Sequence, residues 1–186
     1  SSWTEVSDLN QARTQLLGVG ASSTSALAFG GYYPTYYALT ETWNGSSWTE
    51  VNDLNTARQV TGAGTTNTAA LAFGYEGSSV AAELWNGTNW TEVNDLNQSR
   101  IGLAASGSGG NTSALAFGGE YPPSGNAAIT EDWNGVSWAE TSDLNTARYY
   151  LAGSSSYTQA LAFGGTSNST EEWSVPSTTT KTVSTD

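Results

Sequence analysis

The chain of 186 residues contains no cysteine, no histidine and no methionine, and it has five Lys and Arg residues against seventeen Asp and Glu. The absence of cysteine excludes disulfides, thiolate metal sites and cysteine nucleophiles. The absence of histidine removes the commonest general base and the commonest ligand of transition metals. The formal net charge of −12 argues against nucleic acid as a partner, because such binding depends on Lys and Arg that neutralise phosphates.

Long apolar segments are also missing. No run approaches the roughly 18 apolar residues that a membrane-spanning helix needs, so we expect no membrane partner. No basic segment followed by an apolar one marks a signal peptide. The chain begins Ser1-Ser2-Trp3, without an initiator methionine, and we therefore expect a processed product or a part of a longer protein. Its length suffices for one domain with a substantial core.

A repeated pattern accounts for all of the Phe, Trp and Arg residues. Every Phe lies in a Leu-Ala-Phe-Gly segment, every Arg ends an Asp-Leu-Asn-x-x-Arg segment, and the Trp residues fall into two registers. Successive Arg residues lie 45, 42 and 48 positions apart, which is the period of a β-propeller blade. The residues in register are Phe29, Phe73, Phe117 and Phe163; Arg13, Arg58, Arg100 and Arg148; Trp3, Trp48, Trp90 and Trp138; and Trp43, Trp85, Trp133 and Trp173.

Each repeat divides into four strand-like runs. In the first complete repeat these runs are residues 16–20, 26–29, 40–43 and 48–51. Asn-Gly separates the third run from the fourth in three repeats, and this dipeptide is the strongest short signal for a β-hairpin because both turn residues need a positive φ. No stretch shows helical periodicity of useful length. The sequence therefore predicts an all-β protein.

This pattern resembles the kelch repeat, which has an Arg at the start of each blade, an apolar strand ending in Gly-Gly, an aromatic residue closing the third strand and a Trp in the fourth. The resemblance covers residues 1–175 and implies one propeller domain with units at about 13–57, 58–99, 100–147, and 148–175 together with 1–12. In detail the units are similar to the regular kelch-like repeats of marine bacteriophage and metagenomic proteins, which are often virion- or tail-associated. That likeness implies an extracellular or virion-associated location. Most kelch propellers have about five to seven blades, whereas this chain supplies four.

We predict a four-bladed β-propeller of four-stranded antiparallel blades. Because the chain starts within a unit, Trp3-Thr4-Glu5-Val6 is expected to pair into the last blade as its fourth strand, which closes the ring and covers an exposed edge. The tail, residues 176–186, contains a second strand-like run at 181–186 that competes for the same position or adds an outer strand. We expect a monomer; the alternative is one eight-bladed ring formed by two chains.

Charged residues in register are expected to hold the scaffold. The Glu of the third run lies 17 positions before the next Arg in each of three repeats, and we predict structural ion pairs rather than a charged binding mouth. One Asp per blade cannot converge on a calcium ion, which needs six to eight oxygens, and turn capping explains these Asp residues. We expect no metal and no cofactor. The Glu residues are Glu41, Glu83, Glu131 and Glu171, and the Asp residues are Asp8, Asp53, Asp95 and Asp143.

Ligand recognition is expected where the repeats differ. The connection from Phe to the third-run Glu varies between 8 and 14 positions, and eight of the nine Tyr lie in or beside these connections. Tyr rings supply rigid apolar area with one polar tip, which suits a glycan or a protein surface. The candidate ligand-binding residues are Tyr32, Tyr33, Tyr36, Tyr37, Tyr75, Glu76, Tyr121, Tyr149 and Tyr150.

The sequence thus favours a non-catalytic binding or adhesion module, which recognises a glycan or a cell surface through Tyr-rich loops of a phage tail or extracellular protein. The alternative is a purely structural unit of a virion or appendage. An enzyme is disfavoured and no catalytic residue is expected. The copper oxidase among kelch-like propellers needs His ligands and a Cys-linked Tyr, and adjacent carboxylates such as Glu131-Asp132 point to opposite faces of a strand.

Overall fold

The computed structural model describes residues 1–74, 79–107 and 111–175, and within them the regular structure consists of β-strands without a helix. No helix in the described part of the chain is therefore long and apolar enough to cross a membrane. The strands of these residues are β1 (Leu17–Ser22), β2 (Ser25–Phe29), β3 (Thr40–Trp43), β4 (Trp48–Val51), β5 (Thr61–Thr66), β6 (Ala69–Phe73), β7 (Ala82–Trp85), β8 (Trp90–Val93), β9 (Ala104–Ser106), β10 (Ala114–Phe117), β11 (Glu120–Tyr121), β12 (Gly125–Asn126), β13 (Thr130–Trp133), β14 (Trp138–Glu140), β15 (Ala152–Gly153), β16 (Gln159–Phe163) and β17 (Thr170–Ser174).

Each repeat forms its own antiparallel sheet. Sheet I has the order β1-β2-β3-β4, sheet II β5-β6-β7-β8, sheet III β9-β10-β13-β14 and sheet IV β15-β16-β17, and β11 and β12 form a separate small hairpin. The register repeats as well, since Trp43 pairs with Trp48, Trp85 with Trp90 and Trp133 with Trp138. The prediction of an all-β chain with four-stranded antiparallel sheets is confirmed for sheets I to III, while sheet IV has three strands among the described residues.

The Asn-Gly turns fix the hairpin between the third and fourth strands. Gly45 has a φ of 95°, which an L-residue with a side chain rarely adopts. The side-chain oxygen of Asn44 accepts hydrogen bonds from the backbone N–H groups of Ser46 and Ser47, at 2.9 and 3.0 Å. The local sequence therefore sets the turn, and the turn sets which residues of the two strands face each other.

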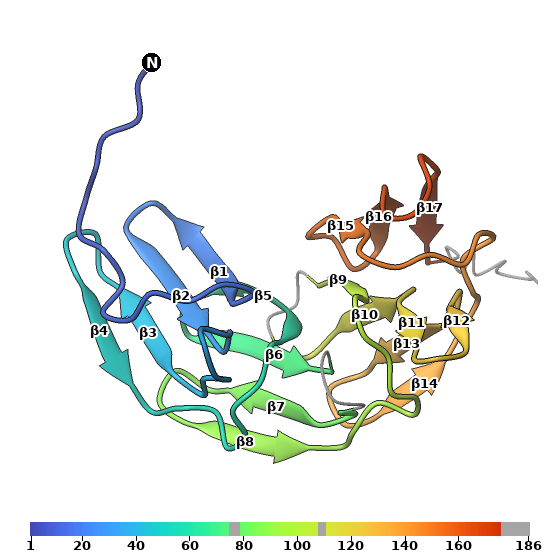
Figure 1. Ribbon diagram of the computed structural model, residues 1–186, viewed down its shortest axis with the longest axis horizontal. Helices are drawn as coiled ribbons and strands as arrows, with labels where there is room; N and C mark the ends of the chain where they lie inside the picture. The colour runs from blue at the N-terminus through green and yellow to red at the C-terminus, as the bar shows by residue number, and fades with distance from the viewer. Residues whose placement is uncertain (75–78, 108–110, 176–186) are drawn as a thin grey trace, which may run out of the picture.

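The sheets follow one another around an arc with the first strand of each on the inside (Figure 1). The inner strands β1, β5, β9 and β15 lie side by side in that order. Small residues permit this approach, because a Cβ added to Gly153 in β15 would collide with the carbonyl oxygen of Ala105 in β9. A separate hydrophobic cluster fills each space between neighbouring sheets, so the core is divided into three parts among the described residues.

The arc is open. Residues 1–9 form no strand, and the side chain of Trp3 is fully exposed, so the predicted pairing of residues 3–6 with sheet IV is not present in this structure. The chain is held on sheet I by Ser7, whose hydroxyl donates to the carbonyl of Ser46 at 2.8 Å, and by Asn10 and Arg13, both of which contact Glu41. The residues before Ser7 project from sheet I and do not reach sheet IV (Figure 1). The competing run at 181–186 lies outside the described residues, and a closed four-bladed ring stays a prediction.

Candidate functional site

Four buried ion pairs join the connecting segments to the sheets. Each Arg lies before the first strand of a sheet and pairs with the Glu on the third strand of that same sheet. The Arg13–Glu41 and Arg100–Glu131 pairs have N···O distances of 2.9 Å, and Arg148–Glu171 has 2.7 Å. The fourth pair is Arg58–Glu83.

This pairing differs from the one that the constant spacing of 17 suggested. That spacing associates Glu41 with Arg58, whereas the structure pairs Arg58 with Glu83 of sheet II. The physical reason is that the Asp-Leu-Asn-x-x-Arg segment crosses from one sheet to the next. Asp53 stays on sheet I and accepts a hydrogen bond from the N–H of Thr40 at 3.0 Å, while Asn55 and Arg58 reach sheet II.

The second oxygen of each Glu is also occupied. Glu131 Oε2 accepts bonds from the backbone N–H and the side-chain amide of Asn97 at 2.7 and 2.9 Å, and the same arrangement recurs at the other three Glu residues. Burial lowers the pKa of the Arg100 guanidinium, and the charge and hydrogen bond of Glu131 partly offset that effect. These carboxylates therefore have little capacity left for a ligand. Among the described residues no group of three acidic side chains is arranged to hold a metal ion.

The first Tyr cluster occupies the connection between β2 and β3. The backbone of Tyr32 pairs with Thr14 and Tyr36 as isolated bridges, and the rings of Tyr32 and Tyr36 lie 5.2 Å apart. Tyr33 at the tip is 59% exposed. Tyr37 is half-buried and turns back to the sheet, where its N–H donates to Gly31 and its carbonyl accepts from Arg58. We call Tyr32, Tyr33, Tyr36 and Tyr37 the first Tyr cluster.

The second Tyr cluster, Tyr121, Tyr149 and Tyr150, lies around the segment that enters sheet III. The β11–β12 hairpin holds Tyr121 and pairs with Ile101 through Glu120. The N–H of Tyr150 donates to Gly102 at 2.7 Å, and a Cβ at Gly102 would lie 2.9 Å from the Tyr150 ring. Gly102 thus leaves the space that the ring occupies.

In this cluster the rings of Tyr149 and Tyr150 lie 4.9 Å apart, and Tyr150 is 60% exposed. Burial raises the pKa of the Tyr121 hydroxyl, partly offset by Arg100, so this group stays a protonated donor at neutral pH.

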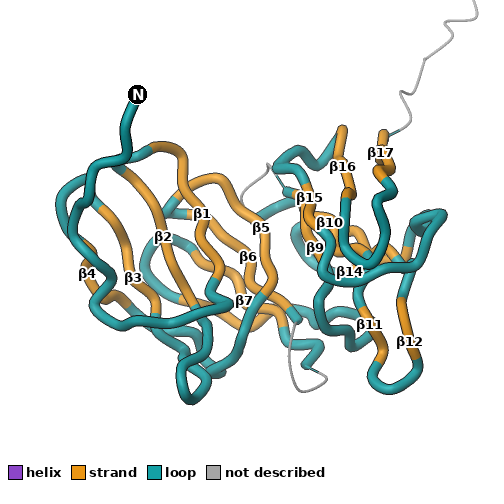
Figure 2. Tube along the Cα trace, turned by 45° about the horizontal axis from the view of Figure 1, so that its top comes forward, coloured by secondary structure: helices purple, strands orange, loops and turns teal. Residues whose placement is uncertain are grey.

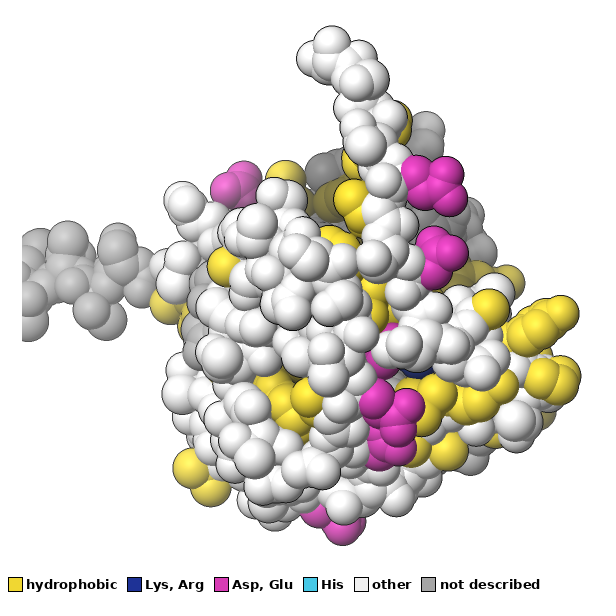
Figure 3. All heavy atoms as spheres, turned by 90° about the vertical axis from the view of Figure 1, so that its left-hand side faces the viewer, with side chains coloured by type: hydrophobic (Ala, Val, Ile, Leu, Met, Phe, Trp, Pro, Cys, Tyr) yellow, Lys and Arg dark blue, Asp and Glu magenta, His cyan; other side chains and the backbone are white. Residues whose placement is uncertain are grey.

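The structure thus brings the predicted ligand-binding residues together in two surface clusters rather than one. Both clusters lie at the sheet ends where the second strand meets the third, and Figure 2 shows the β11–β12 hairpin projecting from that side of the molecule. Tyr75 and Glu76 lie outside the described residues. On the face shown in Figure 3, hydrophobic and acidic side chains are visible and basic ones are almost absent.

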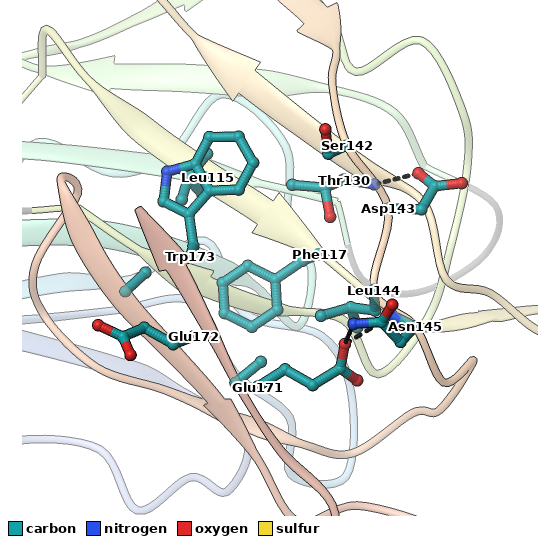
Figure 4. Close-up of a pocket in the computed structure, with 12 residues that line it drawn as sticks. Leu115, Phe117, Thr130, Ser142, Asp143, Leu144, Asn145, Glu171, Glu172 and Trp173 are labelled. Carbon is teal, nitrogen blue, oxygen red and sulfur yellow. Dashed lines mark hydrogen bonds between the residues drawn. The ribbon is translucent and has the colours of Figure 1, made fainter. Parts of the chain in front are cut away.

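Sequence reasoning missed a cavity of about 130 Å³ between sheets III and IV. Phe117 and Trp173 face it from the two sheets, and Thr130 lies at its rim (Figure 4). Glu171 also lines it, but its carboxylate is held by Asn145 and Arg148. The signal was present in the sequence: the fourth-strand Trp of the last repeat stands at the other end of the chain, at Trp3.

Comparison with known proteins gives no assignment from similarity. No family model matches the chain, and no match is found among curated proteins. The features of the chain that bear on its function are therefore the two Tyr clusters, the buried ion pairs and the cavity.

Proposed function

We propose that this chain is a non-catalytic binding module that recognises carbohydrate through its two Tyr clusters. The observation that carries the proposal is the exposure of Tyr33 and Tyr150, at 59% and 60%. Tyr33 adjoins the tilted ring pair of Tyr32 and Tyr36, and Tyr150 forms a tilted ring pair with Tyr149. Such rings offer flat apolar area that packs on the C–H face of a sugar, and each hydroxyl bonds to a sugar hydroxyl at a small cost in side-chain entropy.

The charge distribution favours a neutral or weakly charged glycan. All four Arg side chains are buried in ion pairs with Glu, so they present no positive surface to a sulfate or phosphate group. The formal charge of −12 also opposes a polyanionic ligand. An uncharged polyol avoids this repulsion and still finds hydrogen-bond partners.

We further infer that the four sheets are blades of a kelch-like propeller carried by a phage tail or another extracellular protein. The support is the four-fold register of Arg, Phe, Trp and Glu, together with inner strands that lie side by side around one arc. In this arrangement the constant residues hold the sheets and the variable connections are free to differ, as a recognition surface requires.

A glycan array with the intact chain and single variants tests the proposal. Tyr33→Ala and Tyr150→Ala are expected to weaken binding at least tenfold, while Val136→Ala leaves it unchanged. Val136 is a suitable control because it is an exposed apolar residue in the Asn-Gly turn, at the opposite end of sheet III. If both Tyr variants bind the array as tightly as the wild type, the Tyr clusters are not the site.

A purely structural role is the second candidate, and one observation favours it. Leu161 and Phe163 on sheet IV are 39% and 42% exposed, although the same positions in the other three sheets are buried. An uncovered apolar sheet face is typical of a contact with another protein. Absence of binding to glycans and to cell surfaces, with an unchanged fold, would favour this role over recognition.

A further inference from the structure

The cavity between sheets III and IV is lined by the same kinds of residue that surround a Trp side chain elsewhere in this chain. Its walls include Phe117 from β10, Trp173 from β17 and Thr130 from β13, with Ala160 and Ala162 behind them. Figure 4 shows the rings of Phe117 and Trp173 on the two sides of this space.

The same positions between the other sheets each hold a Trp from the fourth strand. Between sheets I and II, the ring of Trp90 lies 4.8 Å from Phe29 and 5.4 Å from Trp85, and its indole N–H donates to Thr40 Oγ1 at 2.9 Å. Between sheets II and III, Trp138 lies 4.8 Å from Phe73 and 5.4 Å from Trp133.

Phe117, Trp173 and Thr130 occupy the register positions of Phe29, Trp85 and Thr40. The cavity therefore offers an indole the same aromatic partners and the same acceptor that hold Trp90.

One Trp of this chain matches the site. Trp3-Thr4-Glu5-Val6 is identical to residues 48–51 and 90–93, which form the fourth strands of sheets I and II. Sheet IV has no fourth strand beside β17 among the described residues, and Trp3 is fully exposed. The run at 181–186 contains no Trp and cannot supply an indole.

The geometry of the arc decides which chain supplies the strand. Trp3 lies seven positions before Asn10, and Trp48 lies seven positions before Asn55. The segment from Trp48 to Asn55 runs from sheet I to sheet II, which are directly adjacent. Asn10 is already fixed on Glu41 of sheet I. Sheets I and IV of one chain stand at the two ends of the arc (Figure 1), so the strand reaches a sheet IV without moving any sheet only if that sheet belongs to another molecule.

We propose that the cavity and the edge of β17 that no described strand covers are the docking site for residues 3–6 of a second copy of this chain. The strand adds to sheet IV by main-chain pairing, and Trp3 enters the cavity against Phe117 and Trp173. Docking in this way brings sheet I of the second copy against sheet IV of the first, so that its half-buried Trp48 covers the exposed ring of Phe163. The contact is head-to-tail, and two copies that exchange strands close a ring of eight sheets. This proposal does not depend on carbohydrate recognition.

Molecular mass in solution tests it over a concentration series, by light scattering or sedimentation equilibrium. The wild type is expected to pass from one chain of 19.4 kDa to two chains. Raising NaCl from about 50 to about 500 mM should strengthen the association, because each copy carries −12 and salt screens their repulsion. Trp3→Ala should weaken dimerisation about 30-fold or more, the loss expected for a buried aromatic anchor. Tyr33→Ala, which also removes an exposed aromatic ring, should leave it unchanged.

A synthetic peptide of residues 1–12 provides a second measurement. Added in excess, it should fill the cavity and convert the dimer to single chains, whereas the same peptide with Trp3→Ala should not. The Ala160→Leu chain fills the cavity from within and should fail to dimerise as well. The proposal is overturned if the wild type stays a single chain at every concentration. This includes the outcome in which Trp3 is protected from acrylamide quenching in that single chain, because the cavity would then be filled by the chain's own Trp3. A dimer that persists in both Trp3→Ala and Ala160→Leu overturns it equally.

Discussion

The ring of Phe29 in β2 packs against the ring of Trp90 in β8, with centroids 4.8 Å apart, although the two residues belong to different sheets. Phe73 and Trp138 repeat this contact at the same separation between the next two sheets. Each sheet is therefore covered by the outermost strand of the sheet that follows it. Sheet IV is the last sheet of the arc and has no following sheet to cover it, so the ring of Phe163 remains exposed.

The first prediction compares these two Phe residues. Phe29→Ala should lower the free energy of unfolding by about 3–5 kcal/mol, because it leaves a cavity in a closed interface. Phe163→Ala should lower it by about 1 kcal/mol or less in single chains, because the ring is 42% exposed. Urea unfolding at low protein concentration measures both. Equal losses would mean that Phe163 is covered within one chain.

The second prediction concerns the fully buried pair of Arg100 and Glu131. Arg100→Met leaves the carboxylate of Glu131 without its cation and also removes hydrogen bonds to the carbonyls of Gly118 and Ile129. The free energy of unfolding should fall by about 3–5 kcal/mol.

Two further variants serve as controls. Glu92→Gln, which changes an exposed charge, should have an effect below about 0.5 kcal/mol. The double variant Arg100→Met with Glu131→Leu should recover part of the loss, since no unpaired charge remains. A single Arg100→Met variant as stable as the wild type would show that the pair does not hold sheet III.

The third prediction is a dependence of stability on pH at Glu171. Burial by itself would raise the pKa of this carboxyl group, but hydrogen bonds from Asn145 and Thr146 and the charge of Arg148 outweigh it and hold the pKa below the ordinary value of 4.5. A carboxylate with a lowered pKa in the folded state stabilises the fold above its unfolded pKa, and this contribution is lost as the pH falls through the folded pKa.

Urea unfolding of the wild type and of Glu171→Gln, measured from neutral pH to below 4.5, checks this effect. The difference in unfolding free energy between the two proteins should be largest near neutral pH and should shrink below pH 4.5. A difference that does not change with pH would contradict the assignment.

The fourth prediction uses two Ala residues at the same register position. Ala70 is completely buried in the packed interface that contains Trp90, so Ala70→Leu should cost about 1–3 kcal/mol through overpacking. Ala160 lines the open cavity beside Trp173, and Ala160→Leu should be neutral or stabilising in the single chain. Thermal unfolding of the two variants under the same conditions measures the contrast. Equal destabilisation would show that the cavity is not available to a side chain.

The sequence alone determined the four-strand repeat of sheets I to III, the order of those strands and the Asn-Gly turns, but not the β11–β12 hairpin or the absence of a strand at residues 3–6. Asn44-Gly45 sets a turn through its own positive φ and its own side-chain bonds, and the alternation of Ala with Leu and Phe in residues 26–29 decides which side chains share a face. These features depend on residues a few positions apart, and they were therefore readable without coordinates.

Only the tertiary structure decided which Glu each Arg binds, where the Tyr residues gather and how the arc ends. Arg58 lies 17 positions from Glu41 and 25 from Glu83, and it binds Glu83 because its segment crosses to the next sheet. The segments that carry Tyr121 and Tyr150 are brought near each other because Ile101 pairs with Glu120 and Gly102 accepts a hydrogen bond from Tyr150. The cavity at Phe117 arises from the stacking of whole sheets, which no local pattern specifies, because each sheet is completed by residues that belong to its neighbour.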